Sequence, residues 1–346
     1  MGTVRTATNR AGVETAKVTE REFRTMARVE TSGRLHFGFG NLSLAHDRLY
    51  GALGVAIDRP RLVVDATTAE TVRCADADAA GYAERACDLL GVPGAELTVE
   101  SDLPRHAGLG SGTQLALAVL TAIARAYGRA PAARERAPEL GRGGRSGVGV
   151  AAFEQGGFVL DGGHPSALFT SDAPAVGEWE VPPVASRHPI PESWRFLVVV
   201  PDAPAGRSGD EEDAAMRRAV TDADPELADR VAGVVVRGVL PAIADGDVAR
   251  FGDAVSEVGR LNGAWYADEQ GGTYRPPVGS LVDSLSGAAP IYGAGQSSWG
   301  PAVYGVTDAD HADAARAAGR EALAAAGVDG DVFVAEGHNR GASIDP

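Results

Sequence analysis

The sequence contains almost no lysine. Lys17 is the only lysine in 346 residues, and the other permanently charged basic side chains are all arginine. A Walker A loop needs Gly-Lys-Ser/Thr to reach nucleotide phosphates, and Schiff-base catalysis needs a buried amine. The scarcity of lysine therefore excludes P-loop NTPases and pyridoxal-phosphate enzymes.

Cysteines and long apolar segments are scarce as well. The two cysteines, Cys74 and Cys87, lack metal-binding spacing, and so few thiols exclude a disulfide-rich scaffold. No uncharged apolar run reaches the roughly 18 residues that span a membrane. Residues 1–25 have no apolar core typical of a secretory signal, so we expect a disordered extension there, or an effective start at Met26. These features favour a cytoplasmic protein with no membrane partner.

The net charge is strongly negative, at −15. Such a surface opposes binding to nucleic acids and anionic membranes. It is typical of halophilic proteins, although the codon bias of a GC-rich genome also produces lysine-poor sequences. An anionic substrate would need local arginines and backbone N–H groups to overcome the repulsive field of the whole molecule.

The apolar pattern of the first half predicts strands followed by a buried helix. Alternation predicts one strand in Ser32–Leu42 and two more in Tyr50–Ala66, with a break at Asp58–Pro60. Gln114–Tyr127 is predicted to be a helix with an almost wholly apolar surface, which should be buried.

The second half begins with another apolar strand. We expect Trp194–Asp202 to open a second domain and Asp331–Glu336 to form the last strand. Strand groups mixed with helix groups indicate an α+β architecture. The expected domains are 26–190 and 191–346.

A glycine-rich turn directly precedes the predicted buried helix. Gly108, Gly110 and Gly112 allow backbone N–H groups to approach an anion, and Ser111 and Thr113 add hydroxyl donors. The following helix presents the positive end of its dipole. The turn, with Leu109 included, therefore predicts a phosphate site; a purely structural turn is the alternative.

The glycine turn resembles the central motif of the GHMP kinase superfamily. That motif is Pro-x-x-x-Gly-Leu-Gly-Ser-Ser-x-Ala, and the chain has LPRHAGLGSGTQLALA at Leu103–Ala118, with Gly112 replacing the second serine. Three further stretches are similar to the archaeal β-ribofuranosylaminobenzene 5′-phosphate synthase family. They are GRLHFGF in the first strand, GRGGRSGVGVAAFEQGGFVLDGGH at Gly141–His164 and GQSSWGPAVYG at Gly295–Gly305.

The resemblance implies a two-domain GHMP fold, with a ribosomal S5 domain 2-like N-terminal domain and a ferredoxin-like C-terminal domain. It implies a glycosyltransferase that joins phosphoribosyl pyrophosphate to 4-aminobenzoate or 4-hydroxybenzoate at the ring carbon bearing the carboxylate. Pyrophosphate and carbon dioxide leave, and a C-riboside forms, as a step of methanopterin biosynthesis. The resemblance also implies Mg²⁺, no organic cofactor, small-molecule partners and a homodimer.

An ATP-dependent small-molecule kinase of the same superfamily is the alternative. Many such kinases carry Gly-x-Pro-Ser-Gly-x-Asp, whose aspartate takes or orients the acceptor's proton. Here Gly149 stands at the aspartate's position and Arg145 at that of the proline. A hydrogen cannot act as a base, so the pattern favours the synthase, although some superfamily kinases work without this aspartate. A ligand-binding protein on a decayed scaffold is a third interpretation, opposed by the polar glycine turns in both halves.

The expected catalytic residues carry protons or permanent charge: His36, Arg145, Asp161 and His164. Asp161 is also the tentative ligand of Mg²⁺. Guanidinium groups match phosphate oxygens in pairs. The expected substrate-binding residues are Gly108, Leu109, Gly110, Ser111, Gly112, Thr113, Arg142, Ser146, Gln296, Ser297, Ser298, His338 and Arg340.

Each of these assignments has a structural alternative. His36 fits either a cavity wall or a simple hydrogen bond, and Asp161 fits either a metal site or the cap of a turn. The segment with His338 and Arg340 either returns to the site or is a frayed tail. His106 near the glycine turn, Trp299 as a stacking surface for the acceptor, and Arg207 on a loop over the substrate are further candidates.

Overall fold

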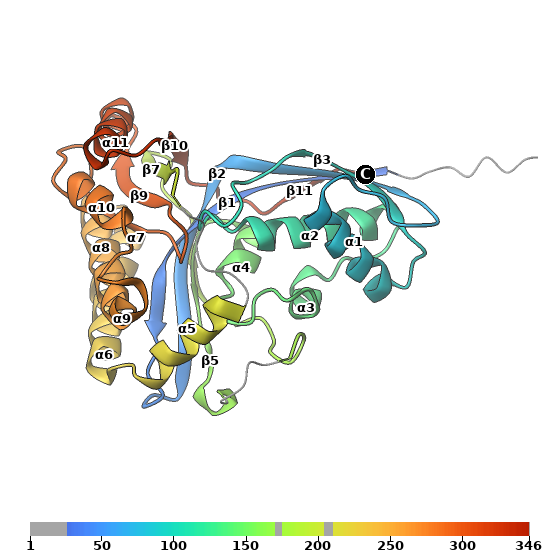
Figure 1. Cartoon of the computed structure of the whole chain (residues 1–346), viewed down its shortest axis with the longest axis horizontal. Helices are drawn as coiled ribbons and strands as arrows, with labels where there is room; N and C mark the ends of the chain where they lie inside the picture. The colour runs from blue at the N-terminus through green and yellow to red at the C-terminus, as the bar shows by residue number, and fades with distance from the viewer. Residues whose placement is uncertain (1–25, 170–174, 204–209, 346) are drawn as a thin grey trace, which may run out of the picture.

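The computed structural model describes residues 26–169, 175–203 and 210–345. The extension expected at 1–25 and the candidate Arg207 lie outside these residues. The chain forms two antiparallel sheets, each covered by helices (Figure 1). In the described residues, no helix combines the length and apolarity needed to cross a bilayer.

The first sheet has seven strands in the order β11-β1-β2-β4-β6, with β3 and β5 also paired to β2. Its strands are β1 (Met26–Asn41), β2 (Arg48–Thr68), β3 (Ala95–Ser101), β4 (Phe158–Asp161), β5 (His164–Pro165), β6 (Val184–His188) and β11 (Ser343–Asp345).

β2 is one long strand, so the prediction of two strands separated at Asp58–Pro60 was wrong. The register against β1 shifts at this point: Ser32 lies opposite Arg61, whereas Arg34 lies opposite Ala56. One residue of β1 therefore faces four of β2. This bulge accommodates the proline without ending the strand.

Helices cover one face of the first sheet (Figure 1). They are α1 (Ala77–Leu90), α2 (Ser111–Ala126), α3 (Ala133–Arg136) and α4 (Val148–Gln155), with the short 3₁₀ turns η1 (Pro138–Leu140) and η2 (Ser166–Leu168). Every side chain of α2 from Gln114 to Ala124 is buried, which confirms the predicted buried helix. Such a helix places its first turn at a fixed point beneath the sheet.

The second sheet has four strands in the order β10-β7-β9-β8. They are β7 (Trp194–Pro201), β8 (Gly293–Gln296), β9 (Val303–Asp308) and β10 (Gly330–Glu336). Its helices are α5 (Asp210–Thr221), α6 (Pro225–Val234), the π-helical η3 (Val235–Val239), α7 (Leu240–Asp245), α8 (Val248–Trp265), α9 (Ala267–Gln270), α10 (Val278–Ser286) and α11 (Ala312–Ala326).

Strand β7 is buried on both faces because its side chains alternate between two cores. Phe196 and Val198 pack with α6 and α8, whereas Leu197 and Val199 pack with α10 and α11. The first of these cores also contains residues of the first sheet. Phe37 of β1, for example, makes edge contacts with the rings of Phe251 and Tyr304, at centroid distances of 5.8 and 4.9 Å.

The end of the chain returns to the first sheet. The last strand is β11, which pairs with β1 through Val29 and Ile344, so β10 is not the last strand as predicted. The chain passes from the first sheet to the second between β6 and β7. The domain boundary at 190/191 stays a prediction, with the qualification that residues 343–345 belong to the first sheet.

Candidate active site

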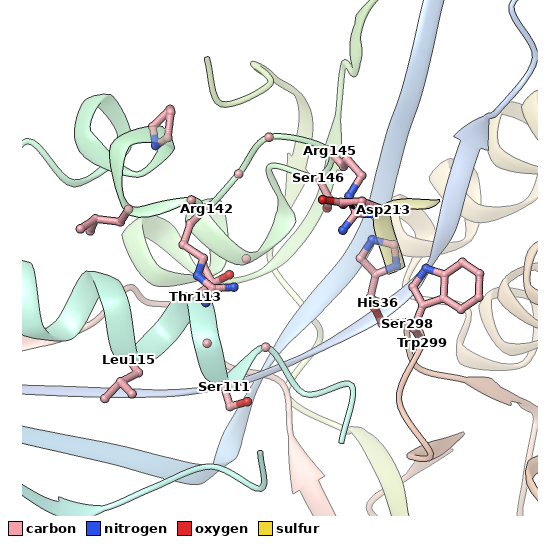
Figure 2. A pocket seen from close by; sticks show the side chains of 18 of the residues that line it. His36, Ser111, Thr113, Leu115, Arg142, Arg145, Ser146, Asp213, Ser298 and Trp299 are labelled. Atoms are coloured by element: carbon pink, nitrogen blue, oxygen red, sulfur yellow. Dashed lines mark ion pairs between the residues drawn. The ribbon is translucent and has the colours of Figure 1, made fainter. Parts of the chain in front are cut away.

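A cavity of about 700 Å³ lies where the elements of both sheets meet. Its walls come from β1, the glycine turn before α2, the turn 141–146 before α4, helix α5 and the turn 298–300. Figure 2 shows its side chains in two groups, one around Arg142 and Thr113 and the other around His36, Arg145 and Trp299.

The glycine turn is fixed by contacts that allow no side chains. Gly108 and Gly110 have left-handed φ angles of 92° and 87°. A Cβ on Gly108 would lie 2.1 Å from the carbonyl oxygen of Ser297. Gly110 caps α2, whose first N–H groups have no acceptor within the helix. The turn therefore presents free backbone donors and the positive end of a 16-residue helix to the cavity.

Two arginine side chains lie directly against glycines of this turn. A Cβ on Gly112 would lie 2.9 Å from Nη2 of Arg142, and one on Gly110 would lie 3.2 Å from Cγ of Arg34. Gly112 is the residue that replaces the second serine of the superfamily motif. Its missing side chain thus leaves the space that the Arg142 guanidinium occupies at the start of α2.

Both guanidinium groups are held by neighbours. Arg142 lies over the ring of Tyr82, 5.3 Å from its centroid, and donates to its hydroxyl. Arg34 donates from Nη1 to the carbonyl oxygen of Gly108 over 2.6 Å. Stacking and hydrogen bonding reduce the entropy lost when an arginine binds an anion. We call Arg34, Arg142 and the turn 108–112 the arginine clamp.

The charge of the cavity opposes that of the chain. Among the described residues, six arginines line the cavity against two aspartates, a net of four positive charges with the histidines neutral, whereas the whole chain has a net charge of −15. They are Arg34, Arg85, Arg105, Arg142, Arg145 and Arg217, against Asp78 and Asp213. A cleft with such local charge concentrates anions despite the repulsive surface.

The second group of side chains is largely aromatic. The cavity wall here includes His36, Phe39, Tyr50, Trp179 and Trp299. The imidazole of His36 makes an edge contact with Phe39 at a centroid distance of 5.1 Å. Figure 2 shows it beside the Arg145–Asp213 ion pair, whose Nη1 and Oδ1 atoms are 3.4 Å apart. This end of the cavity suits a flat ring.

His36 is neutral at physiological pH. Its side chain is buried, and burial together with the charges of Arg34 and Arg145 lowers its pKa to about 3. A neutral imidazole has one N–H donor and one acceptor nitrogen. His36 can therefore accept a proton from a ligand, and it does not act as an imidazolium acid.

Most of the predicted site residues line this cavity. The structure brings together His36, Gly108, Gly110, Ser111, Gly112, Thr113, Arg142, Arg145, Ser146 and Ser298. His106 and Trp299, the further candidates, also border it. Leu109 does not, because its side chain is fully buried in the core.

Asp161, predicted as a catalytic group and metal ligand, does not line the cavity, and its carboxylate is bonded to the backbone. Its carboxylate accepts hydrogen bonds from the backbone N–H groups of Ala52, Gly147 and Gly163 over 3.0, 2.7 and 3.0 Å. Burial raises its pKa to about 6, while the three donors act in the opposite direction. Because both oxygens are occupied away from the cavity wall, the side chain holds the turn before α4 instead of an ion.

His164 also lies behind the cavity wall and not on it. It is buried against Trp179, with ring centroids 4.8 Å apart, and burial lowers its pKa.

The hydroxyl of Ser297 donates to the Gly108 carbonyl over 2.8 Å and accepts from the N–H of His36 over 3.0 Å. Ser297 thus joins the second domain to the glycine turn, and Gln296 lines a separate small cavity.

The segment with His338 and Arg340 returns to the first sheet but not to the cavity. The backbone N–H of His338 bonds to the Ala56 carbonyl over 2.9 Å, and its carbonyl accepts from Gly157 over 2.7 Å. Arg340 is exposed. The segment is therefore bonded to the first sheet and is not a frayed tail, and neither His338 nor Arg340 lines the cavity for which substrate binding was predicted.

Sequence reasoning missed four arginines of the cavity wall: Arg34, Arg85, Arg105 and Arg217. Arg34 stands in the quoted first-strand motif and could have been found there. Arg85 on α1 and Arg217 on α5 belong to helices with ordinary surface charge, and no sequence signal separates them from other arginines.

The described residues contain no group of three or more His, Cys, Asp or Glu side chains arranged to hold a metal. The carboxylates on the cavity wall, Asp78 and Asp213, are both paired with arginines. These donors do not form a resident metal site.

Comparisons with known proteins agree with this architecture. Residues 72–157 match the family described as GHMP kinases N terminal domain. Among solved structures, a homoserine kinase from Cytophaga hutchinsonii aligns with a TM-score of 0.63 at 18% identity, over 94% of this chain and 99% of that one. The Methanococcus jannaschii mevalonate kinase aligns with a TM-score of 0.61 at 13% identity, over 92% and 100%. These likenesses confirm the two-domain GHMP fold and concern the fold alone.

Two curated relatives are similar over nearly their whole length. The β-ribofuranosylphenol 5′-phosphate synthase of Methanothermobacter thermautotrophicus is 33% identical over 330 residues, covering 91% of this chain and 97% of that protein. The protein of the same name from Archaeoglobus fulgidus is 31% identical over 333 residues, covering 92% and 100%. The chain therefore belongs to the β-ribofuranosylphenol 5′-phosphate synthase family, as its motifs predicted.

Proposed function

We propose that the protein is a decarboxylating C-riboside synthase that uses phosphoribosyl pyrophosphate. The observation that carries this proposal is the arginine clamp, in which Gly110 and Gly112 give space to two guanidinium groups at the start of α2. The curated relatives are named for a phenol product. That name favours 4-hydroxybenzoate over 4-aminobenzoate as the acceptor.

The clamp suits a leaving diphosphate. When the bond between the anomeric carbon and the diphosphate breaks, negative charge accumulates on the departing oxygen and the sugar becomes oxocarbenium-like. Preorganised N–H donors and guanidinium groups stabilise that charge without reorganising. Arg34, Arg142 and the N–H groups at Ser111 and Gly112 supply such donors on one wall.

The aromatic end of the same cavity suits the acceptor. A benzoate ring bound among Phe39, Tyr50 and Trp299 would face the sugar held by the clamp. The ring carbon that bears the carboxylate attacks the anomeric carbon, and loss of carbon dioxide then restores aromaticity. Holding both partners in one cavity supplies the orientation that a two-substrate reaction needs.

The kinase alternative fits the site less well. Position 149, where many superfamily kinases carry an aspartate, is buried, and a Cβ there would lie 3.2 Å from Cγ2 of Thr113. A side chain at this position would crowd Thr113 of the phosphate turn. Among the described lining residues, Asp78 and Asp213 are the carboxylates, and both are paired with arginines.

We expect Mg²⁺ to enter the site bound to the substrate. Mg²⁺ is commonly bound through substrate phosphates with few protein ligands. At the phosphate turn, the hydroxyls of Ser111 and Thr113 are the side-chain oxygens that would contact such an ion. A place in methanopterin biosynthesis, a homodimeric state, a cytoplasmic location and adaptation to high salt stay predictions from the sequence.

The proposal is tested by incubating the pure protein with phosphoribosyl pyrophosphate, 4-hydroxybenzoate and Mg²⁺. We expect pyrophosphate release that depends on the aromatic acid, and a product whose mass contains the ribose phosphate and phenol but no carboxylate. The same protein should not hydrolyse or transfer from ATP with added alcohols or acids. ATP turnover without acid-dependent pyrophosphate release would favour the kinase, and tight binding without any turnover would favour a binding protein.

A further inference from the structure

The strongest feature left unexplained is a buried nitrogen on the cavity wall. His36 is 4% exposed, and its Nδ1 has no hydrogen-bond partner among the described residues. Leaving a buried polar atom unpaired destabilises the folded protein. A protein retains such a group where a ligand can use it, and His36 lines both the main cavity and the small cavity behind it.

The surroundings of His36 make it an acceptor instead of a donor cation. The charged groups that face it are Arg34 from its own strand and Arg145 from the turn before α4. Phe39 lies against one edge of the ring, and Trp299 borders the same wall from the second domain. Figure 2 shows the imidazole between Trp299 and the Arg145–Asp213 pair, within the aromatic end of the cavity.

The proposed reaction needs a proton acceptor at this end. Attack by the carboxylate-bearing ring carbon draws electrons from the hydroxyl on the opposite side of the ring. The ring thereby becomes a protonated dienone, and the O–H group of this intermediate is strongly acidic. Even a weakly basic imidazole can take its proton, whereas an arginine cannot.

We propose, on the basis of the function proposed above, that His36 binds the para hydroxyl of the acceptor and takes up its proton while the new carbon–carbon bond forms. The site therefore selects benzoates with a hydrogen-bond donor opposite the carboxylate. His36 thus determines which aromatic acids are accepted, in addition to lining the cavity.

The step balances without a further reagent. The bond from the anomeric carbon to the diphosphate breaks, and its electron pair leaves with the diphosphate. A ring electron pair forms the carbon–carbon bond, and the hydroxyl proton moves to His36. The bond to the carboxylate then breaks, its electron pair restores the aromatic ring, and the phenolic oxygen recovers the proton as carbon dioxide leaves.

The test compares two acceptors in wild type and in His36→Asn. One acceptor is 4-hydroxybenzoate, and the other is 3,5-difluoro-4-hydroxybenzoate, whose hydroxyl is already ionised at pH 8 because fluorine lowers its pKa. General-base assistance commonly contributes about 10²-fold or more, so we expect kcat for 4-hydroxybenzoate to fall by about 100-fold and kcat for the fluorinated acid by less than about threefold. The KM for phosphoribosyl pyrophosphate should stay near the wild-type value.

Phe39→Leu is the matched control, because it alters the same wall without removing a proton acceptor. It should lower the rates with both acceptors by the same factor. If His36→Asn does not fold, His36→Gln takes its place, with the same ratio expected. Equal losses for the two acceptors, or no loss for either, would overturn the role of His36. A wild-type protein that releases no pyrophosphate with either acceptor would instead overturn the proposed function.

Discussion

At the scale of single residues, the site depends on what Gly112 lacks. Any side chain at this position would meet the guanidinium of Arg142, which the ring and hydroxyl of Tyr82 hold in place. The glycine that replaces the second serine of the superfamily motif thus leaves room for an arginine from another part of the chain. A glycine in a phosphate turn and an arginine 30 positions later act as one unit.

Gly112→Ser should therefore weaken binding of phosphoribosyl pyrophosphate by displacing Arg142. A charge-assisted hydrogen bond contributes about 1.5–3 kcal/mol, so we expect the KM for this substrate to rise by about tenfold or more. Steady-state kinetics at saturating aromatic acid measures the effect. Gly81→Ala is the control, because a Cβ there meets nothing within 4 Å. An unchanged KM in Gly112→Ser would show that the clamp does not hold the substrate.

His36 should also give the stability a recognisable pH dependence. Its pKa is about 3 in the folded protein, against about 6.5 in the unfolded chain, so the unfolded state binds the proton more tightly. Stability therefore falls as the pH drops below 6.5, and this one residue accounts for about 2 kcal/mol between pH 7 and pH 5. Urea unfolding of His36→Asn should show a pH dependence weaker by that amount. If the free energy of unfolding depends on pH in the same way in the variant and in wild type, the account is contradicted.

At the scale of elements, α2 is both a core helix and the support of the phosphate turn. Gln114 is fully buried, accepts from the hydroxyl of Thr31 over 2.6 Å and donates to the carbonyl of Gly149 over 2.9 Å. It thus joins β1, α2 and α4 next to the cavity. About two turns further along α2, the hydroxyl of Thr121 is buried with no hydrogen-bond partner among the described residues.

These two side chains of α2 should respond to substitution with opposite signs. Thr121→Val removes an unpartnered hydroxyl at nearly constant volume and should raise the free energy of unfolding by about 1 kcal/mol. Gln114→Leu leaves a hydroxyl and a carbonyl unpaired and should lower it by about 2 kcal/mol or more. Urea titration of both variants checks the pair. A destabilised Thr121→Val would mean that its hydroxyl has a partner after all.

At the scale of the whole molecule, the two sheets are joined at β1. Asn262 of α8 accepts from the N–H of Phe39 over 2.7 Å and donates to its carbonyl over 2.9 Å. A Cβ on the adjacent Gly38 would lie 2.8 Å from this amide. The side chain therefore continues the hydrogen bonding of β1 beyond its own sheet and fixes the strand that bears His36.

Asn262→Asp should weaken this junction, because a carboxylate cannot donate to the Phe39 carbonyl. We expect a loss of about 2 kcal/mol or more in the free energy of unfolding and a higher KM for the aromatic acid. Asp253→Asn, at an exposed position of the same helix, provides the comparison for a change between acid and amide. A variant with wild-type stability would show that the sheets are held by apolar packing alone.

The phosphate turn was predictable because its signal is local. Glycines, hydroxyls and an apolar helix follow one another within 24 residues, and the structure places them as expected. Asp161 shows the limit of such reasoning, since a buried carboxylate in a glycine-rich turn has the same sequence whether it binds a metal or three backbone N–H groups. Only the positions of Ala52 and Gly147 decide between these roles.

Features that depend on contacts between distant parts of the sequence were not predictable, because sequence patterns report only on neighbouring residues. The bulge in β2 depends on pairing with β1 across the sheet, and alternation within Tyr50–Ala66 contains no information about it. Arg85 and Arg217 line the cavity because the tertiary fold places α1 and α5, which are distant in sequence, at its border. The segment at His338 is held by Ala56 of β2 and by Gly157 just before β4, which are distant from it in sequence.

The most direct test of the central claim is a crystal structure of the protein with phosphoribosyl pyrophosphate bound. The account predicts the diphosphate at the first turn of α2, between the guanidinium groups of Arg34 and Arg142, with the anomeric carbon facing His36 and Trp299. A diphosphate bound elsewhere in the cavity, or a nucleotide seated on the turn with a carboxylate at its γ-phosphate, would contradict it.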